Sequence, residues 1–274
     1  MTPSMKLFPL PALLVTALTF ASPLWAEDKP ANPPAVAPSA TPAVTPKPLP
    51  PQPPDVPAVK FDPKTGEPNK GFLAAHDRFV ATAKEGKAQL LFLGDSITAG
   101  WSGPGKDVWE KSFSPWQPAN FGIGGDRTQH VLWRIQNGEL DGLKPKAAVL
   151  MIGTNNVGND TVEGIAQGVT KIVETIRAKT PDTKILLLAV FPRGEKASTP
   201  EKPNGARDKL AQVNTIIAKL ADNQHVFFLD IGAKFLQLDG TISKDIMPDF
   251  LHPTEAGYQI WADAITPKLT ELMK

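Results

Sequence analysis

The sequence predicts a three-layer α/β/α domain with a five-stranded parallel sheet as its middle layer. Short apolar runs of strand length alternate with longer stretches in which apolar residues recur at helical spacing. The short runs are apolar at nearly every position, which is typical of strands that helices cover on both faces. Strands and helices that alternate in this way are characteristic of one parallel sheet with helices on both sides.

Five segments have the length and composition of such strands, and the second of them is the weakest. They are Gln89–Leu93, Ala119–Phe121, Ala148–Ile152, Ile185–Val190 and Val226–Leu229. Helical spacing of apolar residues is found in the segments 72–80, 131–135, 165–176, 210–220 and 258–269. The two longest segments read as irregular, 101–118 and 192–204, are polar and contain proline or glycine. We therefore expect no long hydrophobic lid and a site that is open to water.

Residues 1–26 have the features of a secretory signal peptide. A positive start at Lys6 precedes an apolar stretch, 7–21, that is short for a membrane span, and a cleavage region follows at 22–26. Leu24 is large for its position before the expected cut, so an uncleaved anchor is an alternative. We expect export to the periplasm, the cell surface or the medium, with no stable membrane insertion after cleavage.

Residues 27–58 predict a disordered linker, and residues 59–274 form the predicted folded domain. The linker consists mainly of Pro, Ala, Val and Thr and has almost no aromatic residues, so it cannot form a packed core. The formal net charge of +1, without a basic stripe, argues against nucleic acid as a partner. The chain contains no cysteine, which excludes disulfides, thiolate metal sites and a cysteine nucleophile.

A serine and an Asp–His pair lie near opposite ends of the predicted domain. Ser96 directly follows the first predicted strand, and Asp249 precedes His252 by three residues. A serine hydroxyl becomes a nucleophile when an imidazole takes its proton, and a carboxylate orients the imidazole and stabilises its charged form. Asp95 is adjacent to the serine, but neighbouring side chains diverge, so we expect it to fix the loop by a hydrogen bond.

Two further motifs can stabilise a developing negative charge. A glycine turn, 120–126, follows the second predicted strand, and Asn155 and Asn156 follow the third. Acyl transfer places negative charge on the former carbonyl oxygen, and backbone N–H groups or an Asn amide can donate to it. Each motif alone is also compatible with an ordinary turn. We expect Asn156 to be structural.

These four blocks, in this order, resemble the SGNH (GDSL-type) hydrolases. The run NFGIGGDRTQHVLWRIQNGEL, with GTNN, FPRGEK and DFLHPTEAGY, is similar to the catalytic subunits of platelet-activating-factor acetylhydrolase Ib, over roughly residues 72–272. The resemblance implies a flavodoxin-like fold, with Ser96 as nucleophile, His252 as general base and Asp249 as its orienting acid. It also implies that the Ser96 N–H, the Gly125 N–H and the Asn155 side chain form the oxyanion hole.

The other histidines are His76, His130 and His225, and no two of the four have metal-binding spacing. We expect these three to be packing or surface residues, and we expect neither a metal nor an organic cofactor. The protein is expected to be a monomer or a homodimer.

The expected activity is that of a serine esterase for short acyl groups, above all acetyl. In the resembled family, bulky neighbours of the nucleophile and base line a small acyl pocket, which implies this role for Ile97 and Leu251. Trp101 is expected either to stack on the substrate or to be a packed aromatic residue. The animal subunits carry no export signal, so their substrate is not carried over, and O-acetylated carbohydrate is a candidate.

Two other activities are kept as alternatives. One is a lysophospholipase or thioesterase that acts on longer acyl chains. The other is a carbohydrate-binding protein that keeps the hydrolase fold without its activity, and its mark would be the loss of a triad or oxyanion residue.

Overall fold

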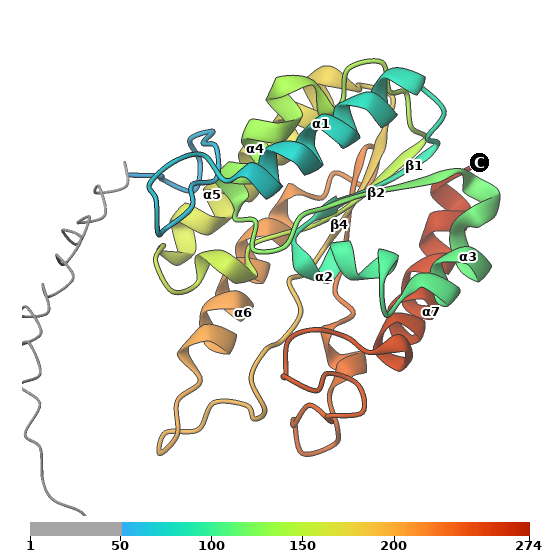
Figure 1. Cartoon of the computed structure of the whole chain (residues 1–274). Helices are drawn as coiled ribbons and strands as arrows, with labels where there is room; N and C mark the ends of the chain where they lie inside the picture. The colour runs from blue at the N-terminus through green and yellow to red at the C-terminus, as the bar shows by residue number, and fades with distance from the viewer. Residues whose placement is uncertain (1–50) are drawn as a thin grey trace, which may run out of the picture. The chain divides into compact units, whose positions relative to one another are not determined.

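The computed structural model describes residues 51–274 (Figure 1). Five strands form one parallel sheet in the order β2-β1-β3-β4-β5. The strands are β1 (Leu90–Gly94), β2 (Pro118–Gly122), β3 (Ala147–Met151), β4 (Lys184–Leu188) and β5 (Val226–Leu229). Their ends lie within about two residues of the predicted ones, so the parallel α/β architecture is confirmed.

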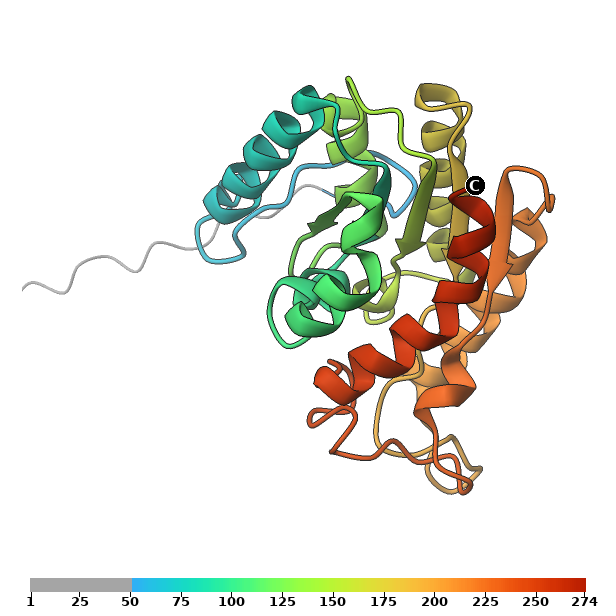
Figure 2. The same ribbon diagram turned by 90° about the vertical axis from the view of Figure 1, so that its right-hand side faces the viewer.

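Helices cover both faces of the sheet (Figures 1 and 2). The α-helices are α1 (Lys70–Glu85), α2 (Ser96–Ala99), α3 (Lys106–Phe113), α4 (Thr128–Arg134), α5 (Val162–Lys179), α6 (Gly205–Ile217) and α7 (Glu255–Leu272). Short helical turns are η1 (Gly100–Ser102), η2 (Ser114–Trp116), η3 (Ile135–Glu139), η4 (Thr154–Asn156), η5 (Ala218–Leu220) and η6 (Gly232–Phe235). Among residues 51–274, no helix combines the length and hydrophobicity that crossing a bilayer requires.

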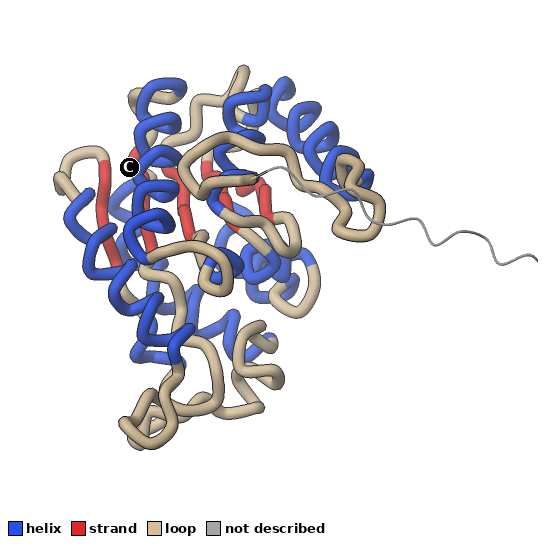
Figure 3. The backbone as a smooth tube through the Cα atoms, turned by 90° about the vertical axis from the view of Figure 1, so that its left-hand side faces the viewer, coloured by secondary structure: helices blue, strands red, loops and turns tan. Residues whose placement is uncertain are grey.

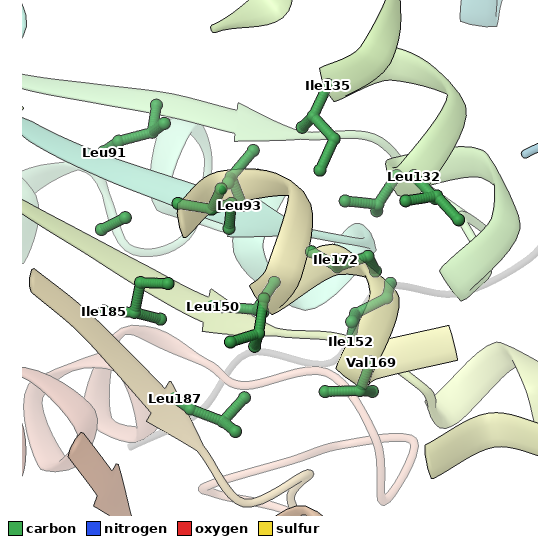
Figure 4. Close-up of a cluster of buried hydrophobic side chains, with 14 of the residues drawn as sticks. Leu91, Leu93, Leu132, Ile135, Leu150, Ile152, Val169, Ile172, Ile185 and Leu187 are labelled. Carbon is green, nitrogen blue, oxygen red and sulfur yellow. The ribbon is translucent and has the colours of Figure 1, made fainter. Parts of the chain in front are cut away.

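Alternate residues of each strand point to opposite faces, so the sheet separates two cores. One core is aliphatic: Leu93 and Leu150 pack against Val169 and Ile172 of α5, as Figure 4 shows. The other is rich in aromatic residues from η1, α3 and α7, which surround Phe92. Each large apolar side chain that is buried in this way contributes about 1.5–3 kcal/mol to folding.

The segment 101–118 is not irregular, contrary to the prediction, because it contains α3. Gly105 precedes this helix and Pro115 follows it closely, which limits it to about two turns, too few for helical spacing to stand out. Its Val108 and Phe113 are buried in the aromatic core. The segment 192–204 contains no helix or strand, as expected.

The end of the predicted linker packs on the domain, so the boundary at residue 59 lies too late. The side chain of Gln129 donates to Gln52 O at 2.9 Å, and the Thr128 hydroxyl donates to Pro54 O at 2.7 Å. Backbone carbonyls in a proline-rich segment are free to accept such bonds, because no helix or strand uses them. Figure 3 shows this segment as the tan tube that continues from the grey trace. The predicted signal peptide and the linker up to residue 50 lie outside the described residues.

Candidate active site

The strand order places the predicted site residues at one end of the sheet. Successive chain segments lead from β1 outward to β2 and then back to β3 on its other side, and ligands bind at such a switch point beyond the carboxyl ends of the strands. Ser96 follows β1, Gly125 follows β2 and Asn155 follows β3. The topology therefore brings together groups that lie far apart in the sequence.

Ser96 is the first residue of α2, which begins directly after β1. Asp95 caps this helix, because its carboxylate accepts the N–H of Ile97 at 3.0 Å, as expected for a loop-fixing residue. Burial raises the pKa of Asp95 to about 7. A Cβ atom on Gly94 would lie only 2.5 Å from Met151 O, so glycine is required where the strand turns into the helix.

The structure brings Ser96, His252 and Asp249 into one hydrogen-bonded chain. Ser96 Oγ lies 2.8 Å from His252 Nε2, and His252 Nδ1 lies 2.6 Å from Asp249 Oδ2. Asp249 Oδ1 accepts the backbone N–H groups of His252 at 2.8 Å and Leu251 at 3.1 Å. With the hydrogen on Nδ1 directed at the carboxylate, Nε2 is left to accept the serine proton.

Two opposing effects set the charge of Asp249. Partial burial acts to raise its pKa, but the hydrogen bonds from the His252 ring and from the two N–H groups outweigh it. The pKa of Asp249 therefore lies below its usual value. The carboxylate is charged at neutral pH and can stabilise an imidazolium.

Phe250 lies between the acid and the base and has a left-handed backbone, with φ of 58°. This conformation is strained for a bulky residue and costs about 1–3 kcal/mol. Phe250 O accepts the N–H of Gly194 at 2.9 Å, and the ring packs against the aromatic core. These contacts hold the sharp bend that places the side chains of Asp249 and His252 on one side of the turn.

The glycine turn lies against the serine. A Cβ atom on Gly124 would be 3.9 Å from the Ser96 Cβ, and Gly125 has φ of 72°, which favours glycine. Asn155 Nδ2 donates to Asp126 O at 2.9 Å, which leaves its second hydrogen free. Within residues 51–274, the N–H groups of Ser96 and Gly125 donate to no protein acceptor. The arrangement is compatible with the predicted oxyanion hole.

Asn156 fixes the same loop from the side of β3. Its Oδ1 accepts the N–H of Thr128 at 3.0 Å, and its Nδ2 donates to Asp160 at 2.8 Å and to Gln129 at 3.1 Å. The side chain is fully buried. Asn156 is therefore structural, as expected.

A buried charge network lies beneath the glycine turn, 120–126. Arg134 is fully buried, and it donates from Nε to Asp126 Oδ2 at 2.9 Å and from Nη1 to Glu139 Oε2. Burial raises the pKa of Asp126 to about 6, although Arg134 opposes the shift. Arg134 is a functional-site neighbour that does not stand out in the sequence. One sequence feature could have indicated its burial: Arg134 lies three residues after the apolar Val131, so both fall on the same, buried side of α4.

The predicted substrate pocket is corrected for two of its three residues. Trp101 is only 1% exposed and packs among aromatic rings, including those of Tyr258 and Trp261, so it cannot stack on a substrate. Ile97 is equally buried in the same core, so it does not line an open pocket. Ile97 follows Ser96 in α2, and its side chain points from this helix into the core. Leu251 is half-buried beside His252 and is still a candidate.

Two of the other histidines are packing residues. His76 Nδ1 lies 2.9 Å from Glu139 Oε1, and burial lowers the pKa of His130 to about 3. The third, His225, is half-buried. In the described part of the chain, no three His, Cys, Asp or Glu side chains are placed to hold a metal ion.

Comparison with known proteins identifies the family. Residues 92–260 match the GDSL-like Lipase/Acylhydrolase family. The chain is 43% identical over 188 residues to platelet-activating factor acetylhydrolase IB subunit alpha2 of Gallus gallus, which covers 68% of this chain and 78% of that protein. The chain therefore belongs to the GDSL-like lipase/acylhydrolase family, and it is an ester hydrolase of this type. The family resemblance of its motifs is confirmed.

Solved structures show the same fold at low sequence identity. A GDSL-like lipase from Bacteroides thetaiotaomicron matches with a TM-score of 0.58 at 20% identity, covering 73% of this chain and 97% of that one. An acetyl-xylooligosaccharide esterase from Geobacillus Stearmophilus matches with a TM-score of 0.53 at 21% identity, covering 69% and 96%.

Proposed function

We propose that the protein is a serine esterase that removes short acyl groups, above all acetyl, from carboxylic esters. The observation that carries this proposal is the hydrogen-bonded chain from Ser96 Oγ through His252 to Asp249, with distances of 2.8 and 2.6 Å. These three groups have the order and geometry that activate a serine hydroxyl.

The reaction proceeds through an acyl-enzyme. Ser96 Oγ attacks the ester carbonyl carbon while His252 Nε2 takes the hydroxyl proton. The charged carbonyl oxygen is stabilised by the N–H groups of Ser96 and Gly125 and by the Asn155 amide. His252 then gives its proton to the leaving alkoxide. A water molecule attacks the acyl-enzyme, again with His252 as base, and the carboxylic acid is released.

The preference for acetyl is supported by the relative from Gallus gallus, whose name is that of an acetylhydrolase. Leu251 lies next to the base and can limit the length of the acyl chain. We further propose that the chain is exported, because residues 1–26 have the pattern of a signal peptide. An exported acetylesterase has O-acetylated carbohydrate within reach, and the fold is one that an acetyl-xylooligosaccharide esterase also uses.

A fluorophosphonate probe tests the nucleophile, because it labels only an activated serine. We expect labelling of the wild type and of Ser114→Ala, a control at an exposed serine, and none of Ser96→Ala. Labelling that persists in Ser96→Ala would overturn the assignment.

A series of p-nitrophenyl esters from acetate to octanoate tests the acyl preference. We expect kcat/KM to be highest for acetate and to fall with chain length. An optimum at octanoate would favour the alternative of a long-chain acyl hydrolase. Acetate release from acetylated xylan tests the substrate class. Export is tested separately, by recovering the protein from outside the cytoplasm and determining its N-terminal residue.

A further inference from the structure

Lys60 contacts the peptide that joins Gly124 to Gly125. Its ammonium donates to Gly124 O and lies 3.6 Å from Asp126 Oδ1. A Cβ atom on Gly125 would be 3.0 Å from Lys60 Nζ, so the lysine occupies the space above this glycine. The side chain is only 20% exposed. A lysine held in this way acts on one defined peptide group.

The position of Lys60 is set by its own backbone. Lys60 O accepts the N–H of Asn69 at 2.7 Å, and the next residue, Phe61, pairs with Pro68 in an isolated antiparallel bridge. Asn69 also caps α1 through its side chain. The lysine is therefore anchored to the start of a long helix. It precedes the residues that match the family, 92–260.

The ammonium and the oxyanion would act on the same peptide unit from opposite ends. The carbonyl of Gly124 and the N–H of Gly125 belong to one trans peptide, so they point in opposite directions. A cation at the carbonyl oxygen withdraws electron density and makes the N–H a stronger donor, because hydrogen bonds in a chain polarise one another. Ser96 lies next to Gly124, because a Cβ atom on this glycine would be 3.9 Å from the Ser96 Cβ.

We propose that Lys60 is a positioning residue of the oxyanion hole: it holds the peptide between Gly124 and Gly125 with its N–H toward Ser96 and strengthens that N–H as a donor. The proposal rests on the proposed function, because it takes the Gly125 N–H as an oxyanion donor. Lys60 does not touch the substrate.

The charge of Lys60 depends on the groups around it. Burial lowers its pKa below the ordinary value, Asp126 acts to raise it, and Arg134 and Arg127 act to lower it. His130 also faces this cluster, and the low pKa of its ring keeps it neutral. Since the ammonium is needed for the effect, kcat should fall when alkaline pH removes its proton.

The first test measures kcat, KM and Tm for p-nitrophenyl acetate hydrolysis. We expect Lys60→Met to lower kcat about tenfold, less than the loss of a donor itself, with KM within about twofold of wild type. Lys60→Arg should restore most of kcat. Lys146→Met is the matched control, because Lys146 Nζ also donates to a backbone carbonyl, that of Met273, at 2.9 Å. Lys146 directly precedes β3, at the end of the strand that lies away from the site. This variant should keep the wild-type kcat.

The second test is the alkaline limb of kcat. In Lys60→Arg it should move to higher pH, because a guanidinium keeps its proton. If kcat falls at the same alkaline pH in wild type and in Lys60→Arg, the proposal is overturned, even if Lys60→Met does not fold. A wild-type kcat in Lys60→Met overturns it as well. Ser96→Ala distinguishes a failure of the proposed function from a failure of the role of Lys60. If Ser96→Ala still hydrolyses the ester, the proposed function fails. If Ser96→Ala is inactive and Lys60→Met is fully active, only the role of Lys60 is removed.

Discussion

The turn that carries the proposed base and the loop that carries the proposed oxyanion donors are held in place in opposite ways. Among residues 51–274, the Asp249 side chain bonds only to residues two and three positions further on, and its side chain and that of His252 are 54% and 44% exposed. The loop is held by side chains from distant segments, among them Asn155 and the fully buried Arg134. Phe250 ties the bend to Gly194 and to the aromatic core, but the exposed side chains of Asp249 and His252 can change with little effect on the fold, whereas the loop is continuous with the core.

This difference predicts that base-turn variants lose activity and keep stability. His252→Ala should lower kcat by roughly 10⁴- to 10⁶-fold, because the serine loses its general base. The exposed imidazole contributes little to folding, so Tm should stay within a few degrees of wild type. Steady-state kinetics and thermal unfolding of the same preparation check this. A large fall in Tm would contradict the local character of the turn.

Variants beneath the oxyanion loop should instead lose stability. Arg134→Met removes the buried cation that bonds to both Asp126 and Glu139, which costs about 3–5 kcal/mol of unfolding free energy. Urea unfolding measures this change. Lys171→Met, which breaks the exposed pair with Glu174, is the control and should cost less than about 1 kcal/mol. Equal effects of the two variants would remove the contrast between a buried and a surface network.

A change at Asn155 should affect both activity and stability. If its amide donates to the oxyanion, Asn155→Ala should lower kcat about 100- to 1000-fold, or roughly 2.7–4 kcal/mol of barrier, with a smaller change in KM. The variant also loses the bond to Asp126 O, so Tm should fall modestly. Near-normal turnover per folded molecule would sink the oxyanion role and leave Asn155 as a turn residue.

The smallest expected effect is on how stability changes with pH, which has opposite signs for Asp95 and Asp249. The pKa of Asp95 is raised to about 7 from 3.8, so between these values the folded state binds more protons and stability falls as pH rises. The pKa of Asp249 is lowered, so its contribution is lost as pH falls. Asp95→Asn keeps an acceptor for the helix cap but cannot ionise. Its Tm relative to wild type should therefore rise by a few degrees between pH 5 and 8, and a constant difference would argue against a buried titrating acid.

The sequence predicts the strands well, and it singles out the short motifs around Ser96 and His252, because both depend on local patterns. Each strand is an apolar run, and the strand order then brings Ser96 and His252 together. The buried polar groups are harder to predict. An arginine at position 134 or a lysine at position 60 has the composition of a surface residue, and only the fold shows which carboxylate or carbonyl it meets. For the same reason the sequence leaves open whether Trp101 stacks on a substrate or packs in the core, and the fold buries it in the core.

The proposed nucleophile, Ser96, and its proposed base, His252, are separated by 156 residues along the chain. A ribosome completes Ser96 and Asn155 long before it adds Asp249 and His252, and α7 comes after them. A nascent or C-terminally clipped chain therefore contains a serine without a base and is inert toward esters. If Ser96 and His252 act as proposed, hydrolysis can begin only after residue 252 has been added and the segments between the two residues have folded.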